Sequence, residues 1–272
     1  MKKDRGIVKW LLIALCAVFL VALLVLPLIY VVVTAIRDGW NAYVKSVTDT
    51  YAVKSILLTL EVVAITVVVN TIFGVFAAWI ITKFTFRGKK IISTLIDLPL
   101  AISPIIAGLI FVLTFGRQSF LYPYLEKAGV QIIFAVPGIV LATIFVTFPF
   151  ISREIIPVLT AAGSDEEEAA AMMGANGFQI FTQITFPHIK WALLYGIVLC
   201  SARAMGEFGA VSVLSGHLRG ITNTMPLYIE LLYQAFDFMG AFAMSSILVV
   251  MAVIILVLRN ILEYRGQKEG DA

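Results

Sequence analysis

The chain has 272 residues, of which 61% are hydrophobic and 14% are charged, and its formal net charge is +3. Soluble domains carry about 25% charged residues, so this composition excludes an ordinary soluble enzyme and indicates an all-α integral membrane protein. The length fits a single membrane domain, 1–272, and leaves no room for an additional soluble catalytic domain. Cys16 and Cys200 lie inside apolar runs without metal-ligand spacing, so we expect buried free thiols.

Six apolar stretches follow one another, at 10–35, 55–82, 91–115, 134–151, 191–214 and 238–258. Crossing the hydrocarbon core takes about 20 helical residues, so each stretch predicts a transmembrane helix. The first is too long for the apolar part of a signal peptide, and we expect it to be retained as a helix. In the third, Pro99 and Pro104 remove backbone donors and predict a kink or break in a helix that faces the bundle interior.

The distribution of Lys and Arg predicts the orientation, because an excess of these residues marks the cytoplasmic side. With a cytoplasmic N-terminus, thirteen of the 20 basic residues fall inside, six fall outside and Arg203 lies within the membrane. We therefore expect both termini inside (N-in/C-in) and a cytoplasmic loop over 152–190. The inside residues are Lys2, Lys3, Arg5, Lys9, Lys83, Arg87, Lys89, Lys90, Arg153, Lys190, Arg259, Arg265 and Lys268, and the outside residues are Arg37, Lys45, Lys54, Arg117, Lys127 and Arg219.

That loop contains a polar segment, residues 164–187, with its own helix signals. Ser164 and Glu167 have the spacing of a capping box, which predicts a short helix over 165–173 with acidic residues at its positive end. Gly174 suits a left-handed helix end, and Asn176 begins a turn. We expect a second short helix over 178–184, and Pro187 fits the first turn of the fifth membrane helix.

Two interpretations of this segment are open: a solvated loop with well-capped helices, or a helix that docks on another protein. We favour docking, because the small side chains of 169–171 permit close approach and apolar residues that face water usually mark an interface. Those apolar residues are Met172, Met173, Phe178 and Phe181.

Charged residues also occur inside the membrane stretches. Arg203 and Glu207 are four residues apart, so they share one face of the predicted fifth helix. They either line a path for an anion or form a structural ion pair that seals the outer gate, and we favour the ion pair. We expect Asp97 to cap amides freed near Pro99, and we expect no metal site, because the chain has only two histidines.

The chain contains no G-x-x-x-x-G-K-[ST] sequence, so it should not bind ATP phosphates itself. If the chain takes part in uphill transport across the membrane, the energy must then come from ATP hydrolysed by another polypeptide. One class of membrane protein that fits the apolar spans is an ion-coupled secondary transporter. That interpretation would leave the segment 164–187 unexplained, and we find no inverted repeat of the kind common in such transporters.

The segment 164–187 resembles the cytoplasmic signature of binding-protein-dependent ABC importer permeases at Glu168, Ala169, Ala170, Gly174, Ile184 and Pro187, with Phe186 where the family usually has Leu. Residues 97–104, 203–213, 215–220 and 226–230 are similar to sulfate/molybdate-type permeases. They resemble the W-type subunit of sulfate/thiosulfate importers more than its T-type sister or the molybdate permease.

The resemblance implies six helices in the type I (MetI-like) ABC importer permease fold, in a bacterial inner membrane. The chain would be a permease and not an enzyme, with no cofactor of its own, since a partner ATPase would bind ATP and Mg²⁺. Further partners would be a T-type sister permease, an extracytoplasmic sulfate-binding protein and membrane lipid, but no nucleic acid. Molybdate or tungstate remains an alternative cargo.

The candidate site residues fall into two sets. The candidate ATPase-coupling residues are Glu167, Glu168, Ala169, Ala170, Gly174, Ala175, Ile184 and Pro187. The candidate residues of the translocation path or gate are Arg203, Glu207, Gly206, Gly209, Ser212, Pro99, Ser103 and Pro104.

Overall fold

A computed structural model describes residues 4–270, which form helices and contain no strand. The helices are α1 (Asp4–Leu20), α2 (Leu26–Ile36), α3 (Trp40–Val47), α4 (Thr50–Lys83), α5 (Lys89–Ala101), α6 (Pro104–Phe115), α7 (Tyr122–Lys127), α8 (Val136–Thr147), α9 (Pro149–Ala162), α10 (Asp165–Met172), α11 (Gly177–Ile180), α12 (Phe186–Met205), α13 (Gly209–Leu214), α14 (Met225–Gln234) and α15 (Phe238–Gly270). Two π-helical turns, η1 (Val21–Val25) and η2 (Phe181–Thr185), join α1 to α2 and α11 to α12.

Five helices are long and apolar enough to cross a membrane: Val8–Ile36, Thr50–Lys83, Val136–Ala162, Gly177–Met205 and Phe238–Tyr264. A sixth candidate span is the pair α5 and α6, which are bent by 110° relative to each other. The six apolar stretches are therefore helical as predicted, and the third is broken. The orientation (N-in/C-in) stays a prediction, because length and composition identify spans but not the side on which their ends lie. Of the basic residues that predict it, Lys2, Lys3 and the side chains of Arg5, Arg265 and Lys268 lie outside the part that the structure describes.

The break in the third span falls at Ile102 and Ser103, directly before Pro104. Both residues are extended, with ψ of 135° and 134°. Proline disfavours the helical conformation for the residue before it and is well placed at the first position of a helix. Pro104 therefore ends one helix and begins the next, whereas Pro99 stays within α5.

The fourth span is longer than predicted, because the helix continues to Ala162 where we expected the loop to begin at residue 152. Ile151, Ile155 and Leu159 recur every four residues and are buried. Arg153 and Glu154 lie between them and lower the local hydropathy, which hid this buried stripe. The loop between the fourth and fifth spans is correspondingly shorter than predicted.

The fifth span is shifted. Our expectation of a separate helix over 178–184 is wrong, because α11, η2 and α12 run continuously from Gly177 to Met205. The expected span to residue 214 is also wrong, since the helix ends at Met205 and α13 begins at Gly209.

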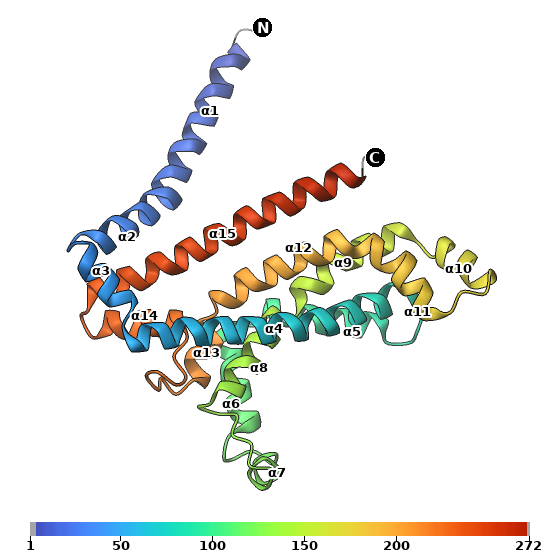
Figure 1. Ribbon diagram of the computed structural model, residues 1–272. Helices are drawn as coiled ribbons and strands as arrows, with labels where there is room; N and C mark the ends of the chain where they lie inside the picture. The colour runs from blue at the N-terminus through green and yellow to red at the C-terminus, as the bar shows by residue number, and fades with distance from the viewer. Residues whose placement is uncertain (1–3, 271–272) are drawn as a thin grey trace.

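The long helices pack beside one another, with α12 in contact with α9, α4 and α15 (Figure 1). The short helix α13 packs on α6 and α8. Helix α1 diverges from the bundle, and none of the apolar window of its span is buried (Figure 1). Cys16 on α1 is accordingly exposed, contrary to our expectation, whereas Cys200 is buried as predicted.

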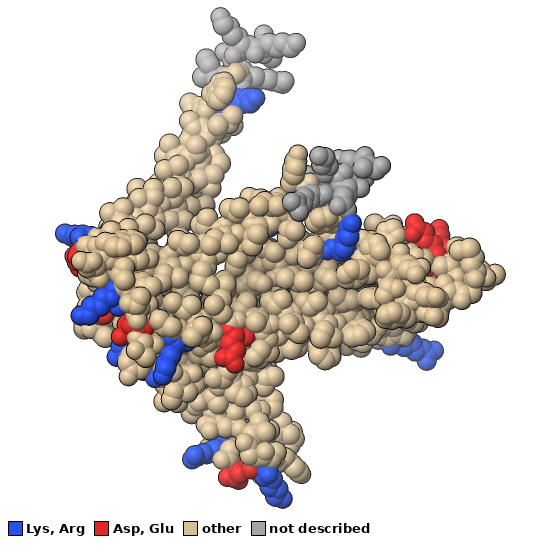
Figure 2. Space-filling view, in the orientation of Figure 1, with Lys and Arg blue, Asp and Glu red and all other residues tan. Residues whose placement is uncertain are grey.

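Helices α10 and α11 lie at the end of the bundle opposite α3 and α14 (Figure 1). On the face drawn in Figure 2, most charged side chains lie near helix ends and at the tip beside α7, which leaves much of the central surface without charge.

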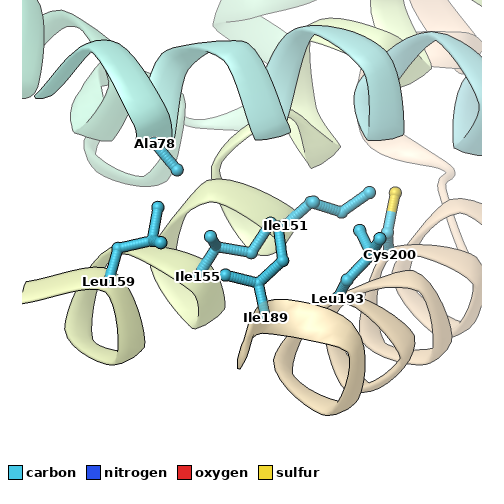
Figure 3. Close-up of a cluster of buried hydrophobic side chains, with 7 residues drawn as sticks. All are labelled: Ala78, Ile151, Ile155, Leu159, Ile189, Leu193 and Cys200. Carbon is cyan, nitrogen blue, oxygen red and sulfur yellow. The ribbon is translucent and has the colours of Figure 1, made fainter. Parts of the chain in front are cut away.

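The core nearest to α10 joins α4, α9 and α12 (Figure 3). Its buried residues are Ala78, Ile151, Ile155, Leu159, Ile189, Leu193 and Cys200. Two glycines bring the backbones together there. A Cβ on Gly196 of α12 would lie 3.0 Å from Ile151 Cα, and a Cβ on Gly74 of α4 would lie 3.1 Å from Ile151 Cβ. Small residues allow such close helix approach in membrane bundles.

Candidate functional site

Helix α10 covers nearly the predicted residues and ends as Gly174 requires. Gly174 has φ of +90°, a left-handed conformation that favours glycine. Its N–H donates to the Ala171 carbonyl at 3.0 Å, and the Ala175 N–H donates to the Ala170 carbonyl at 3.0 Å. This pair of bonds is a Schellman motif, so Gly174 and Ala175 together terminate the helix.

The predicted capping box of Ser164 and Glu167 is wrong. The Ser164 side chain caps no backbone amide, and its hydroxyl donates to Glu168 at 2.7 Å. The box occurs one helix later, where the Asn176 side chain accepts from the Gln179 N–H at 2.9 Å and the Gln179 side chain accepts from the Asn176 N–H at 2.8 Å. Glu167 is used elsewhere, in a longer-range contact.

Glu167 ties α10 to the bundle. One carboxylate oxygen lies 3.0 Å from Lys83 Nζ in the last turn of α4, and the other accepts a hydrogen bond from the Thr185 hydroxyl at 2.7 Å. Lys83 also donates to the carbonyl of Gly163, between α9 and α10. The sequence analysis missed Lys83 and Thr185, because no local pattern marks a partner 84 residues away.

Several apolar side chains of the segment are uncovered in this chain. The side chains of Met172, Met173 and Phe178 are 90%, 83% and 78% exposed, whereas Phe181 is half-buried and contacts the Trp79 ring. Ala169 is exposed and Ala170 is buried. Ile184 lines a narrow crevice with Lys83 and Glu167. Pro187 lies just after the π-helical turn η2 and inside the continuous helix Gly177–Met205, so it does not begin the fifth span as we expected. The segment therefore has an inner contact with the bundle, made by Glu167, and an outer face that carries the exposed Met172, Met173 and Phe178 as well as the exposed acidic residues of α10, which are Asp165, Glu166 and Glu168.

Most candidate path residues lie at or beside the two helix breaks, which the structure brings together, whereas Pro99 lies within α5. A Cβ on Gly209 would lie 2.9 Å from Pro104 Cβ, and a Cβ on Gly108 would lie 2.7 Å from the Ala210 carbonyl oxygen. The start of α6 thus packs closely on α13. Ser103 is exposed at the break, and the Ser212 hydroxyl donates to the Gly209 carbonyl at 2.9 Å.

Arg203 and Glu207 form an ion pair of 2.6 Å, with Glu207 buried and Arg203 half-buried. The pair does not arise from a continuous helix, since Glu207 lies in the break after Gly206. The second Glu207 oxygen accepts the Ala210 N–H at 2.9 Å, so the carboxylate also holds the first turn of α13. Arg203 therefore has a carboxylate partner in this chain, and the assignment of the pair to a path or to a gate stays a prediction.

Asp97 does not cap backbone amides, and that expectation is wrong. Its carboxylate lies 2.9 Å from Arg153 Nε on α9. His188 lies 2.9 Å from Glu166, also on the protein surface. Among the side chains that the structure describes, no three of His, Cys, Asp or Glu are grouped so as to hold a metal ion.

Comparison with known proteins identifies the class. Residues 70–268 match the family of binding-protein-dependent transport system inner membrane components. The fold matches a chain of the bacterial alginate ABC transporter, solved with its alginate-bound periplasmic protein, with a TM-score of 0.80, 18% identity and 96% of both chains covered. The predicted ABC importer permease fold is therefore confirmed.

Individual relatives agree with this class. The sulfate transport system permease protein CysW of Escherichia coli (strain K12) is 44% identical over 261 residues, 96% of this chain and 90% of the relative. CysW of Synechocystis is 43% identical, with 95% of this chain and 94% of the relative covered. CysT of Escherichia coli (strain K12) is 32% identical, with 91% and 89% covered.

The chain belongs to the binding-protein-dependent transport system inner membrane components. The predicted resemblance to W-type sulfate permeases is confirmed. The chain is a permease in a membrane and not an enzyme, and its family implies an ATPase and a substrate-binding protein as partners.

Proposed function

We propose that the chain is the W-type permease subunit of an ATP-driven importer for sulfate or thiosulfate. The observation that carries this proposal is the similarity to CysW proteins at 42–44% identity over nearly the whole chain. The T-type relative is less similar, at 32% identity, and supports a heterodimer with a T-type sister. An extracytoplasmic binding protein would deliver the anion, and ATP and Mg²⁺ would bind to the ATPase.

In this proposal the segment 164–187 is the cytoplasmic coupling segment. Its outer face, with Met172, Met173 and Phe178 exposed, has the character of a protein interface. The exposed Glu168 and Ala169 lie on the same short helix. ATP-driven closure of the ATPase dimer would move α10 and shift the permease between inward-facing and outward-facing states.

The breaks at Pro104 and Gly206 would form the movable part of the path. The Arg203–Glu207 pair fixes the start of α13, which packs on α6, so displacement of either helix alters the other. We propose that this pair acts as part of the gate. Selection of the anion would be left mainly to the binding protein.

Uptake of labelled sulfate tests the proposal. The chain is expressed with a T-type permease, the ATPase and the binding protein in a strain that lacks its own sulfate permeases. Sulfate uptake that needs all four components, and that excess thiosulfate inhibits, is expected. Inhibition by molybdate or tungstate alone would favour the molybdate-type alternative. Uptake without the ATPase would refute the ABC importer in favour of an ion-coupled transporter.

A further inference from the structure

The backbone gives α10 only a loose attachment to the bundle. Glycines with positive φ lie at both ends, Gly163 at +69° and Gly174 at +90°. A Cβ on either glycine would meet no atom within 4 Å, so neither position is packed in place. A helix held only by two unpacked glycine turns would tilt when pushed, and its movement would reach the membrane helices weakly.

One side chain on α10 compensates for this. Glu167 is 17% exposed, whereas its neighbours Asp165, Glu166 and Glu168 are exposed. Its two carboxylate oxygens contact Lys83 on α4 and Thr185 in the turn before α12. Lys83, which is 10% exposed, also bonds the Gly163 carbonyl. We call Lys83, Glu167 and Thr185 the coupling node, since they join α4, α10, α12 and the hinge at Gly163.

The helix ends favour both charges. Lys83 lies in the last turn of α4, where the helix dipole stabilises a cation, and Glu167 lies in the first turn of α10, where it stabilises an anion. Limited solvent exposure reduces screening of the pair. A second contact in the same region, His188 with Glu166, is 42% and 68% exposed and should contribute less, because exposed pairs are strongly screened.

We propose that Lys83 is a positioning residue for energy coupling, which makes α10 move as one body with α4 and α12. The inference rests on the proposed function of α10 as the ATPase-docking helix. Lys83 does not contact the ATPase in this proposal. Its loss should leave docking intact and reduce the transmission of movement.

The test compares K83M and E167Q with the matched control E166Q in the complete transporter. Three quantities are measured: ATPase co-purified with the permease, ATP hydrolysis with and without loaded binding protein, and sulfate uptake. For both K83M and E167Q we expect stimulated hydrolysis and uptake to be reduced about fivefold or more, the range of ordinary coupling free energies. For K83M, which lies outside the candidate ATPase-coupling residues, we also expect normal co-purification and basal hydrolysis. E166Q should behave as the wild type.

Charge-retaining and charge-exchanged variants separate positioning from a general structural role. K83R should restore most of the uptake, and K83E combined with E167K should transport better than either single variant. If K83M is not recovered in the membrane, E167Q carries the test, because its amide oxygen still accepts the Thr185 hydrogen bond.

The inference would be overturned if K83M and E167Q showed the stimulated ATP hydrolysis and the sulfate uptake of the wild type. It would also be overturned if the ATPase failed to co-purify with both variants. Failure of the wild-type complex to bind an ATPase or to import sulfate would instead refute the proposed function.

Discussion

Gly196→Val should force α12 away from α9 and destabilise the bundle beside α10. The ideal Cβ at Gly196 lies 3.0 Å from Ile151 Cα, 3.5 Å from the Phe150 carbonyl oxygen and 3.6 Å from Glu154 Cβ. Two of these three atoms belong to the backbone of a helix, so they cannot move aside by changing a rotamer. Valine would add two further carbon atoms in the same space.

The magnitude follows from the contact distances. Carbon atoms in favourable contact are about 3.5–4.0 Å apart, so the first added carbon alone requires a shift of about half an ångström. Overpacking of this kind costs about 1–3 kcal/mol. Removing a helical glycine gains well under about 1 kcal/mol of helix propensity, which offsets part of that cost.

The variant Gly6→Val measures the gain in helix propensity alone, because Gly6 lies in α1 with no atom within 4 Å of its ideal Cβ. Gly74→Ala provides a graded comparison with Gly196→Ala. The Cβ of an alanine at position 74 would lie 3.1 Å from the Ile151 side chain, and part of that side chain can move aside. We therefore expect Gly196→Ala to destabilise more than Gly74→Ala.

The assay is reversible unfolding of the detergent-solubilised chain by SDS, followed by far-ultraviolet circular dichroism. Gly196→Val should unfold at lower SDS than both the wild type and Gly6→Val. Equal unfolding midpoints for Gly196→Val and Gly6→Val would refute the close packing of α9 on α12 as a source of stability.

Three further predictions concern the segment 164–187, the Arg203–Glu207 pair and the loop after α13. Gly174→Val should reduce sulfate uptake without unfolding the chain, because its left-handed φ of +90° costs a residue with a side chain about 1–2 kcal/mol. Gly177→Val is the control, since Gly177 has an ordinary φ and open surroundings, and equal uptake by the two variants would contradict the argument. Arg203→Ala should lower uptake but leave the co-purified ATPase unchanged, since Arg203 lies at the opposite end of α12 from the coupling segment, and loss of the ATPase would count against its assignment to the gate. Arg219→Gln should make the loop after α13 more accessible to protease, because the guanidinium lies 4.5 Å from the centroid of the Tyr51 ring, a contact worth about 0.5–1 kcal/mol at an exposed site. An unchanged cleavage rate would show that this contact does not hold the loop.

Local sequence determined that the apolar stretches are helical and where several helices end. A run of some twenty apolar residues has one stable backbone solution in lipid, so the presence of helical spans followed from length and composition, whereas the bounds of the fourth and fifth spans did not. Pro104 and Gly174 act on their own backbone and immediate neighbours. Their effects, a helix break and a left-handed helix end, were therefore predicted without knowledge of the fold.

Tertiary structure decided the partners of the charged side chains. Glu167 has the spacing of a capping residue, yet it pairs with Lys83, because the fold places the last turn of α4 beside the first turn of α10. Asp97 likewise pairs with Arg153 from another helix, and Glu207 holds the start of α13 across a helix break. A charged side chain pairs with the partner that lies nearest in three dimensions. The spacing of residues in the sequence reveals only the partners that lie within one or two helical turns.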